Sequence, residues 1–404
     1  MSVPALRFKG FTEDWKKQLL GSIFSFKNGV NASKDQYGSG FKFINVLDII
    51  NNNFITYDNI IGAVDISTEE FLKNEVKYGD VLFQRSSETR EEVGQSNVYI
   101  GDKSVTFGGF VIRGRGISEY YPHFFNYVLK TDAVRDEVTQ RSGGSTRYNI
   151  GQESLNSVEL HLPIISEQKI IANFLRAVDE KITQLTQKFE LLALYKKGVM
   201  QQIFSQKLRF KYDDEQAFPE WNEYLLNDAL IKNSSKNKRG EFTLVQSVSN
   251  KHGFINQDEL FEDRVIASKD LSNYYVIKKS AFAYNPSRID VGSLAYKKDD
   301  LTSVVSPLYV SFYAKPNLII DKFLLNWFES ESFKNQMNSS FEGSVRNTLS
   351  YDSLSKILIS LPCIHEQSKI VTFLTAFDDK LKHTQNQLEA AKQYKQGLLQ
   401  QMFV

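Results

Sequence analysis

Two short loops in this chain carry the residue types that hold a phosphate group. The first, Ser142-Gly143-Gly144-Ser145-Thr146-Arg147-Tyr148, has its counterpart 199 residues later in Gly343-Ser344-Val345-Arg346-Asn347. Glycines expose backbone N–H groups, hydroxyls donate hydrogen bonds, and an arginine binds a phosphate through two parallel hydrogen bonds. The residues expected to contact phosphate are Gly144, Ser145, Thr146, Arg147, Tyr148, Ser344, Arg346 and Asn347. The alternative is an ordinary turn whose arginine caps a helix or pairs with an acid.

The rest of the sequence offers little for catalysis. It has no phosphate loop of the form G-x-x-x-x-G-K-[ST], and its five histidines are scattered without metal-ligand spacing. Cys363 is the one cysteine, which excludes an internal disulfide and a Cys/His cluster. Tyr284-Asn285-Pro286-Ser287 faintly resembles the Asn-Pro-Pro-Tyr/Phe motif of amino-methyltransferases, but the second proline and a glycine-rich cofactor loop are missing. We therefore expect no catalytic residue and no metal site on this chain.

The two loops belong to a repeat that runs through the whole chain. Leu162-Pro163-Ile164-Ile165-Ser166-Glu167-Gln168 returns as Leu361-Pro362-Cys363-Ile364-His365-Glu366-Gln367, and 18 of the 44 positions aligned from there to the C-terminus are identical. Leu6-Arg7-Phe8-Lys9 likewise returns as Leu208-Arg209-Phe210-Lys211. In the diverged middles, Gly79–Arg85 can be aligned with Lys279–Asn285. A fixed period of this length indicates two copies of a domain with a tail element.

The repeated tail is predicted to be a long helix. After Ser166, a plausible N-cap, apolar residues recur at steps of three and four in both copies. A helix of about 37 residues would be roughly 55 Å long. Two such helices most simply bury their apolar stripes against each other, as an antiparallel pair with a globular domain at each end.

The globular halves are predicted to be mixed α/β domains. Asp80–Phe83, Ser96–Ile100 and Val304–Phe312 have strand composition, and Phe124–Lys130 and Phe323–Glu329 have helix composition. The predicted fold is mixed α+β, with two similar domains, an antiparallel coiled coil and approximate two-fold symmetry. The predicted boundaries are 1–161 and 208–360 for the globular domains, and 162–207 and 361–404 for the helical regions.

The bulk composition sets limits on partners and location. The net charge is +1, and the two globular halves carry −2 and −1, so a surface for nucleic acid must be a local concentration of Lys and Arg. No run approaches the roughly 20 apolar residues of a membrane span, and Met1-Ser2-Val3-Pro4 does not resemble a signal peptide. A cytoplasmic location is expected.

Several repeated motifs together resemble one family. Gly144-x-x-Arg147 and Gly343-x-x-Arg346 each precede Leu-Pro-x-Ile-x-Glu-Gln, and there follow Ile171-x-x-Phe174-Leu175 and Ile370-x-x-Phe373-Leu374, then Asp179-x-Lys181 and Asp378-x-Lys380. In these motifs the chain resembles the DNA-specificity subunits of type I restriction-modification systems over essentially its whole length.

The resemblance implies a function without catalysis on this chain. Each recognition domain would read one half of a split target in double-stranded DNA, and the paired helices would dock two methyltransferase subunits that use S-adenosylmethionine to methylate adenine. Restriction subunits that use ATP and Mg²⁺ would join that core. Two alternatives remain open: a nuclease or methyltransferase with unrecognised motifs, and a structural coiled-coil protein without a role on DNA.

Within that implied function, base reading is expected in the diverged middles. Arg and Lys suit guanine, and Asn and Gln suit adenine. The candidates are Gln84, Arg85, Ser86, Arg90, Arg113 and Arg115 in the first half, and Lys236, Lys238, Arg239, Tyr284, Asn285, Ser287 and Arg288 in the second. The candidates for docking partner subunits lie near the ends of the helices: Tyr195, Gln201, Gln202, Phe204, Tyr394, Gln400, Gln401 and Phe403.

Overall fold

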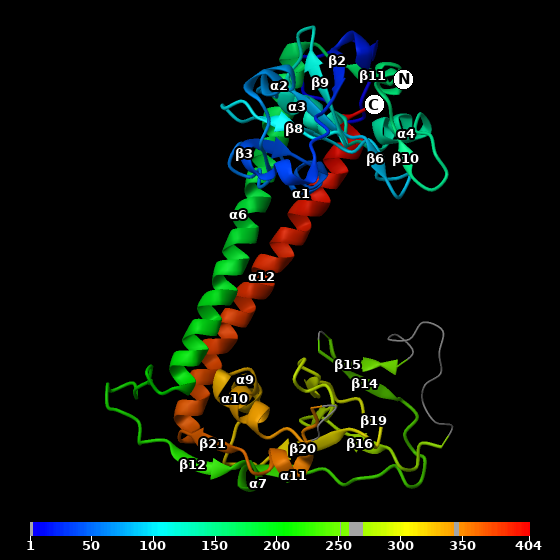
Figure 1. Cartoon of the computed structure of the whole chain (residues 1–404). Helices are drawn as coiled ribbons and strands as arrows, with labels where there is room; N and C mark the ends of the chain where they lie inside the picture. The colour runs from blue at the N-terminus through cyan, green and yellow to red at the C-terminus, as the bar shows by residue number, and fades with distance from the viewer. Residues whose placement is uncertain (1–2, 251, 258–269, 343–346) are drawn as a thin grey trace. The chain divides into compact units, whose positions relative to one another are not determined.

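The chain folds into two compact units, seen in a computed structural model that describes residues 3–250, 252–257, 270–342 and 347–404 (Figure 1). The first unit consists of Met1–Thr186 together with Asn386–Val404, and the second consists of Gln187–Gln385. Each unit therefore combines a globular domain with parts of two long helices. No helix in the described part of the chain is both long enough and apolar enough to cross a membrane.

The first unit is built around a four-stranded antiparallel sheet in the order β2-β9-β5-β7. Its strands are β2 (Phe24–Asn28), β9 (Val111–Gly116), β5 (Val81–Gln84) and β7 (Ser96–Val98). A smaller sheet joins β3 (Tyr37–Ile44) to β4 (Ala63–Val64) and β8 (Thr106–Phe107), and two pairs are formed by β1 (Lys16–Leu19) with β11 (Glu159–Leu162) and by β6 (Ser86–Ser87) with β10 (Tyr148–Asn149). The short helices are α1 (Val46–Asn51), α2 (Thr68–Lys73), α3 (Pro122–Val128), α4 (Asp132–Gln140) and α5 (Gln152–Asn156).

The second unit repeats this plan. Its four-stranded sheet, β13-β20-β17-β18, consists of β13 (Leu230–Lys232), β20 (Val310–Ala314), β17 (Phe282–Tyr284) and β18 (Leu294–Tyr296). The strand pairs are β12 (Asn222–Leu225) with β21 (Leu358–Leu361), β14 (Gln246–Ser249) with β15 (Gly253–Asn256), and β16 (Tyr275–Ile277) with β19 (Ser303–Val305). The short helices are α7 (Leu226–Ala229), α9 (Asp321–Phe328), α10 (Glu331–Ser339) and α11 (Tyr351–Leu354). The predicted class, with two similar mixed domains, is confirmed.

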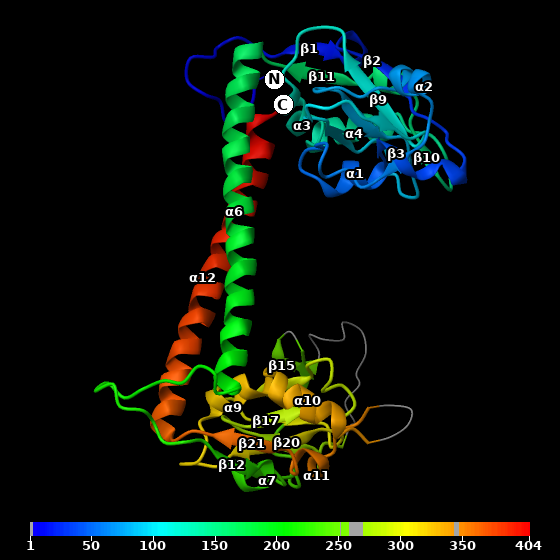
Figure 2. The same cartoon turned by 60° about the vertical axis from the view of Figure 1, so that its left-hand side comes forward.

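The predicted long helices are α6 (Ile165–Phe204) and α12 (Ile364–Met402). In each unit, part of α6 runs antiparallel to part of α12, as expected (Figure 2). The helix start was predicted less well, because Ser166 lies inside α6 and does not cap it. The N–H groups of Glu167 and Gln168 already donate to the carbonyl oxygen of Ile164, both at 3.0 Å.

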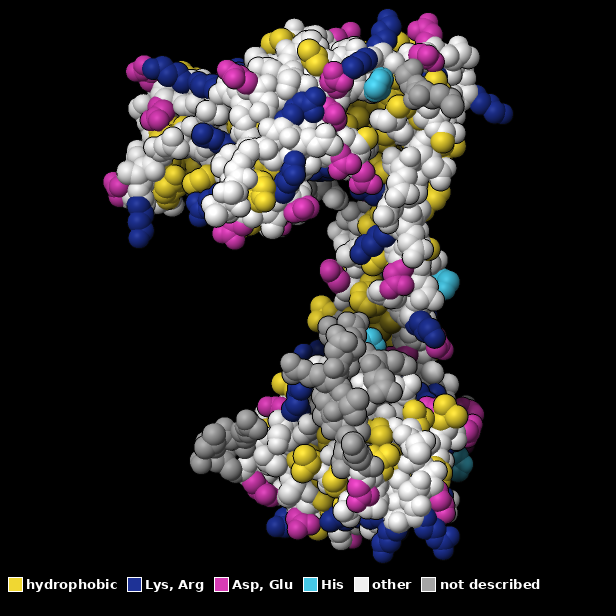
Figure 3. All heavy atoms as spheres, turned by 90° about the vertical axis from the view of Figure 1, so that its right-hand side faces the viewer, with side chains coloured by type: hydrophobic (Ala, Val, Ile, Leu, Met, Phe, Trp, Pro, Cys, Tyr) yellow, Lys and Arg dark blue, Asp and Glu magenta, His cyan; other side chains and the backbone are white. Residues whose placement is uncertain are grey.

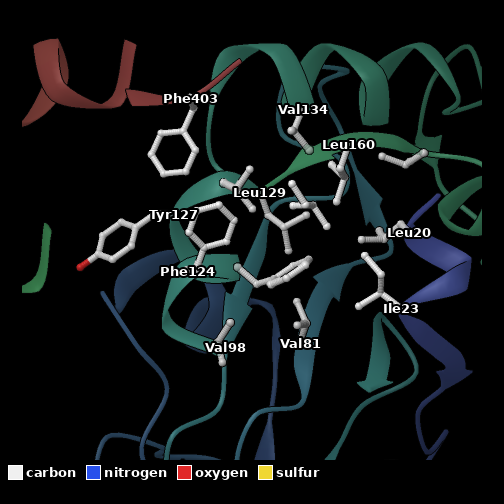
Figure 4. Packing of buried hydrophobic residues seen from close by; sticks show 14 of the residues in the cluster. Leu20, Ile23, Val81, Val98, Phe124, Tyr127, Leu129, Val134, Leu160 and Phe403 are labelled. Carbon is white, nitrogen blue, oxygen red and sulfur yellow. The ribbon is translucent and has the colours of Figure 1, made fainter. Parts of the chain in front are cut away.

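The main core of each unit joins its sheet to its helices. In the first unit, Phe83 and Phe124 pack with Leu160 and, from the helices, with Leu175 of α6 and Met402 of α12. Figure 4 shows Phe403 reaching this core from the end of α12, while the hydroxyl of Tyr127 points out of the cluster. The second core has the same plan, with Phe282, Phe323, Ile203 of α6 and Leu374 of α12. Each domain is thus held to both helices by apolar burial.

Two equivalent ion pairs tie the start of each repeat to its long helix. Arg7 donates to both carboxylate oxygens of Glu167, from Nε at 2.7 Å and from Nη2 at 2.8 Å. Arg209 does the same to Glu366, at 2.8 and 3.0 Å. Both carboxylates are almost completely buried, so each needs a bidentate partner. This pairing explains why Leu-Arg-Phe-Lys and Glu-Gln recur together in the sequence.

The two repeats also begin alike at the ends of their helices. The N–H of Leu6 donates to the carbonyl oxygen of Gln401 at 2.8 Å in the first unit, and the N–H of Leu208 donates to that of Gln202 at 3.0 Å in the second. Gln202 and Gln401 are equivalent in the repeat, as are Leu6 and Leu208. The start of each globular domain is therefore attached to the same point of a long helix.

The expected alignment of Arg85 with Asn285 is wrong by one residue. The N–H of Ile150 donates to the carbonyl oxygen of Arg85 at 3.0 Å, and the N–H of Leu349 donates to that of Pro286 at the same distance. Ile150 and Leu349 are separated by 199 residues, as in the rest of the repeat. Arg85 therefore corresponds to Pro286.

The shift exchanges the faces of the aligned strands, because successive strand residues point to opposite sides. Phe83 and Tyr284 now correspond, and both lie in the main core of their unit. Gln84 corresponds to Asn285 and not to Tyr284. The alignment failed here because few identities were available in the diverged middles to fix it.

The predicted strand Val304–Phe312 is two strands joined by a tight turn. β19 ends at Val305 and β20 begins at Val310. The N–H of Tyr309 donates to the carbonyl oxygen of Ser306 at 3.1 Å and closes the turn. Pro307 has no N–H to donate to a ladder, which favours a break at this point.

Candidate nucleic-acid interface

The first predicted phosphate loop is the tip of a small hairpin. Gly143 and Asn149 exchange backbone hydrogen bonds, with N–H to O distances of 2.9 and 2.8 Å. Gly144 has a φ of +125°, and a Cβ there would lie 1.9 Å from the carbonyl oxygen of Arg147. Glycine is therefore required for this turn. The side chains of Ser145, Thr146 and Arg147 are exposed at the tip.

This hairpin lies against the end of β5, where base-reading residues were predicted. β10 pairs with β6, which places Tyr148 opposite Ser87 and Asn149 opposite Ser86. The hydroxyl of Ser86 donates to Oδ1 of Asn149 at 2.5 Å. Arg85 is joined to the same hairpin through the N–H of Ile150. The structure thus brings the phosphate loop together with Arg85 and Ser86, which lie more than fifty residues earlier.

The second unit has an equivalent hairpin. Glu342 and Thr348 exchange backbone hydrogen bonds of 2.9 and 3.2 Å, and the N–H of Leu349 binds the carbonyl oxygen of Pro286. Asn347 is exposed. Ser344 and Arg346, which were predicted to contact phosphate, lie outside the described residues.

The candidates after β17 form a short exposed segment beside that hairpin. Oδ1 of Asn285 accepts the N–H of Ser287 at 3.1 Å, and the N–H of Arg288 donates to the carbonyl oxygen of Asn285 at 3.0 Å. The side chains of Ser287 and Arg288 are exposed. Both units therefore place polar side chains at the same edge of the main sheet, next to the hairpin.

Three predicted base readers are corrected, because they are buried. Gln84 is 4% exposed and donates from Nε2 to the carbonyl oxygen of Ser86 at 3.0 Å. Tyr284 is fully buried, and its hydroxyl donates to the carbonyl oxygen of Leu349 at 3.0 Å. Burial raises the pKa of Tyr284 well above its usual range. Arg113 is 7% exposed, and its guanidinium donates from Nη1 to the carbonyl oxygen of Glu75. None of the three presents its polar group at a surface.

Arg115 is partly exposed but already has an anionic partner. It donates to Asp80 from Nε at 3.1 Å and from Nη2 at 2.7 Å, and Nη2 also lies 2.7 Å from the carbonyl oxygen of Glu75. The hydrogen bond to Asp80 raises the pKa of Arg115, whereas burial and the neighbouring Arg115 lower the pKa of Arg113. The two arginines hold the sheet to the segment after α2, which is a structural role in this conformation.

The remaining candidates lie on other exposed segments. Arg90 is exposed and donates from Nε to the carbonyl oxygen of Thr139 at 3.3 Å. Lys236 binds the carbonyl oxygen of Asn273 at 2.8 Å. Lys238 and Arg239 follow it with exposed side chains. Lys236 forms a strand bridge with Tyr275, so this basic run belongs to a different edge of the second unit from Asn285.

The predicted docking residues divide into exposed and buried ones. Tyr195 and Tyr394 are 59% and 56% exposed. Gln201, Gln202, Gln400 and Gln401 are all exposed. The prediction for Phe204 and Phe403 is corrected, because both side chains are buried. The ring centroid of Phe204 lies 5.4 Å from that of Phe323, and the ring centroid of Phe403 lies 5.5 Å from that of Phe124. These two phenylalanines hold each domain to its helix, which leaves the tyrosines and glutamines for docking.

The surface charges seen in Figure 3 do not form one large basic face among the described residues, so an anion would be attracted by individual groups of Lys and Arg. On this face, Lys and Arg are interspersed with Asp and Glu on the surface of each unit. Within the described residues, no group of three His, Cys, Asp or Glu side chains is placed to hold a metal ion.

Comparison with known proteins agrees with the repeated architecture. Residues 12–193 and 220–393 each match the family described as type I restriction modification DNA specificity domain. The two matches together cover most of the chain. The chain therefore belongs to this family of type I restriction-modification specificity subunits.

Similar proteins match over nearly the full length. The putative type I restriction enzyme MjaX specificity subunit of Methanocaldococcus jannaschii is 23% identical, over 96% of this chain and 93% of that protein. The type I restriction enzyme StySPI specificity subunit of Salmonella potsdam is 21% identical, over 97% and 89%. The crystal structure of a type I restriction-modification S subunit from M. genitalium has a TM-score of 0.58 at 16% identity, over 100% of this chain and 99% of that one, which shows a shared fold.

Proposed function

We propose that this chain binds double-stranded DNA as the sequence-reading subunit of a type I restriction-modification complex. Each unit reads one half of a two-part target. The hairpin of each unit holds the phosphate backbone, in the first unit through the exposed Ser145, Thr146 and Arg147, and the polar segment beside it reads base edges. Phosphate contacts supply position and affinity, while base contacts supply specificity.

One observation carries this proposal. In both units, a hairpin of repeated sequence lies directly against a segment of diverged sequence, at the carbonyl of Arg85 in one and of Pro286 in the other. Two recognition domains that bind phosphate in the same way need the same hairpin. If they recognise different half-targets, they also need different side chains beside that hairpin. A purely structural protein has no use for this division.

The proposal includes partner subunits, and membership of the family supports action within a complex. Two methyltransferase subunits dock on the long helices near Tyr195 and Tyr394 and methylate adenine with S-adenosylmethionine. Restriction subunits that use ATP and Mg²⁺ join them. Work on complex assembly in the type I system includes a chain of the same fold, with a TM-score of 0.58 and 14% identity, which supports action within a complex. This chain itself carries no catalytic residue in the proposal.

Methylation mapping tests the proposal directly. The chain is co-expressed with the methyltransferase subunit encoded beside it, and the host DNA is sequenced for N6-methyladenine. The expected result is one split motif, with two specified halves around an unspecified spacer. A soluble complex that leaves the DNA unmethylated would count against the proposal.

A second measurement addresses the enzyme alternative. The purified chain is incubated with DNA and either Mg²⁺ or S-adenosylmethionine, without any other subunit. The proposal expects neither cleavage nor methylation. Activity of the isolated chain would show that the division of labour is wrong.

A further inference from the structure

Phe110 occupies an unusual position at the tip of a tight turn. The turn joins β8 to β9 and is closed by the N–H of Val111, which donates to the carbonyl oxygen of Gly108 at 2.9 Å. The side chain of Phe110 is 66% exposed. Phe110 lines one pocket together with Leu47 and Ile61, which are also exposed, and a contiguous apolar patch of this kind marks an interaction surface.

The second unit presents a large apolar residue at the same position. Ile112 pairs with Phe83, and Val310 pairs with Tyr284, which makes Phe110 and Leu308 equivalent. Leu308 is 80% exposed. Its turn, between β19 and β20, is closed by Tyr309 in the way that Val111 closes the first. The repeat has therefore kept an exposed apolar tip where most of the surrounding sequence has diverged.

The first tip adjoins the candidate DNA-binding hairpin. The N–H of Arg85 donates to the carbonyl oxygen of Phe110 at 2.8 Å, and its Nη1 donates to that of Gly109 at 3.3 Å. Arg85 is also the residue that receives the N–H of Ile150 from the hairpin. Arg85 therefore makes backbone hydrogen bonds both to Phe110 and to the hairpin that carries the phosphate loop.

The surroundings of Phe110 suit an apolar, uncharged group. Phe110 lines a cavity of about 660 Å³ together with Leu47 and Ile61, and no charged side chain lines it. Ile61 is 93% exposed and Leu47 is 63% exposed. The polar side chains in the lining are those of Asn31, Tyr37 and Asn45, and none of them adds a charged group. DNA bases can approach this surface without meeting a carboxylate.

We propose that Phe110 and Leu308 are specificity-determining residues that contact the C5-methyl group of a thymine, one in each half-target. That methyl is the apolar group that base edges present in the major groove, and phenylalanine is among the side chains that contact it. A complex that methylates adenine needs an A·T pair in each half of its target, so each unit meets at least one thymine. The inference rests on the proposed function of the chain.

Replacing thymine by deoxyuridine tests the inference, because it removes the methyl and nothing else. The chain is purified with its methyltransferase subunit, and its affinity is measured for target duplexes with one thymine replaced at a time in the first half. The wild-type complex should lose about fourfold in affinity at one thymine, the effect of one buried methyl group. Phe110→Ala should bind the unmodified target about tenfold more weakly and be indifferent to that replacement.

Matched variants separate this role from general effects. Phe110→Leu, the residue of the second unit, should keep the response to deoxyuridine. Leu72→Ala, an equally exposed apolar residue on α2, should bind as wild type. Phe110→Ala removes no charge, so the slope of affinity against salt should stay the same. Leu308→Ala should change only the response at the second half.

The outcomes distinguish failure of the inference from failure of the proposed function. If the wild-type complex binds all DNA alike, the proposed function fails. If it binds its target specifically but Phe110→Ala binds equally well, the inference alone is overturned. If Phe110→Ala weakens binding while no deoxyuridine matters to the wild type, Phe110 stacks on bases, and the assignment to a methyl group is wrong.

Discussion

Nζ of Lys395 lies 2.6 Å from Oδ1 of Asp179, and the pair joins α12 to α6 within the first unit. The repeat places Lys196 at the position of Lys395 and Asp378 at that of Asp179, and these two residues form the same 2.6 Å pair in the second unit. One pair therefore uses the acid of α6 and the base of α12, and the other uses the reverse. This exchange is what two-fold symmetry requires of an interface between equivalent surfaces.

Removing the acid of each pair should have unequal effects on stability. Asp179 is 13% exposed and also accepts the hydroxyl of Tyr127 at 2.7 Å, whereas Asp378 is 51% exposed. Asp179→Asn should lower the free energy of unfolding of the first unit by about 1–3 kcal/mol. Asp378→Asn should cost the second unit less than about 1 kcal/mol. Urea unfolding followed by circular dichroism measures both, with the exposed Glu180→Gln as control; equal losses would contradict this account.

Acidification should destabilise the first unit through His123. Its side chain is 7% exposed, lies among the rings of Phe54, Tyr121 and Tyr78, and has no hydrogen-bond partner for Nδ1 within the described residues. Burial, with a smaller contribution from Arg176, lowers the pKa of His123 below the usual value of about 6.5. Below pH 6.5 the unfolded chain takes up a proton that the folded chain does not, so stability falls as the pH falls.

Two substitutions check this effect on the thermal midpoint between pH 7.5 and pH 5. His123→Phe should make the midpoint of the first unit less sensitive to pH. His383→Gln, at an exposed position on α12, should leave the sensitivity unchanged. The prediction is contradicted if the thermal midpoint of the wild type rises on acidification and His123→Phe abolishes that rise.

The sequence predicted the repeated parts of the fold better than the diverged ones. Steps of three and four residues predicted both long helices, since a stripe of that period is visible without knowing its partner. The start at Ile165 and the role of Glu167 were missed. The role of Glu167 depends on Arg7, which lies 160 residues earlier and whose contact with Glu167 no local pattern reveals.

The candidate site was predicted in part for a similar reason. The hairpin at Gly144 was found because glycine and arginine recur at fixed spacing. Gln84 and Tyr284 were chosen by residue type alone, although strand residues alternate between core and surface. Both side chains are buried, at 4% and 0% exposed, so residue type without the strand's facing direction selected the wrong residues. Phe110 was not considered, because a lone exposed phenylalanine carries no sequence signal.

Removing Arg147 should weaken DNA binding without changing sequence preference. Its exposed guanidinium at the hairpin tip is proposed to hold a phosphate, which is present on every sequence. Arg147→Ala should lower affinity for specific and random duplexes by a similar factor, about tenfold, and reduce the salt slope by about 1. Arg141→Ala is the control, since Arg141 pairs with Glu137 at 2.5 Å. A change in the preferred sequence would assign Arg147 to base reading instead.

Removing Arg288 should act on one half of the target. It is exposed at the segment that follows β17, next to the second hairpin. Arg288→Ala should relax the choice at one position of the second half-target, with a loss of about 1–3 kcal/mol of discrimination. Methylation mapping of the variant complex measures this directly. Relaxation in the first half would contradict the assignment of Arg288 to the second unit's reader.

The chain ending at residue 207 should form a symmetric dimer. In the first unit, the core is completed by Leu398 and Met402 of α12 and by Phe403, which directly follows that helix. A second copy of the half-chain would offer, at the equivalent positions, Val199, Ile203 and Phe204 of α6. These are apolar residues of similar size, a kind of exchange that cores tolerate.

The charged contact is also preserved in such a dimer. Lys196 of the second copy takes the place of Lys395 and meets Asp179, and the two-fold operation forms the pair twice. Size-exclusion chromatography with light scattering should give twice the mass of the half-chain, and Asp179→Lys should return it to a monomer. With the methyltransferase subunit added, the dimer should methylate a target whose two halves are identical and inverted. A wild-type half-chain that stays monomeric at micromolar concentration would show that the repeat of the helices is not sufficient for pairing.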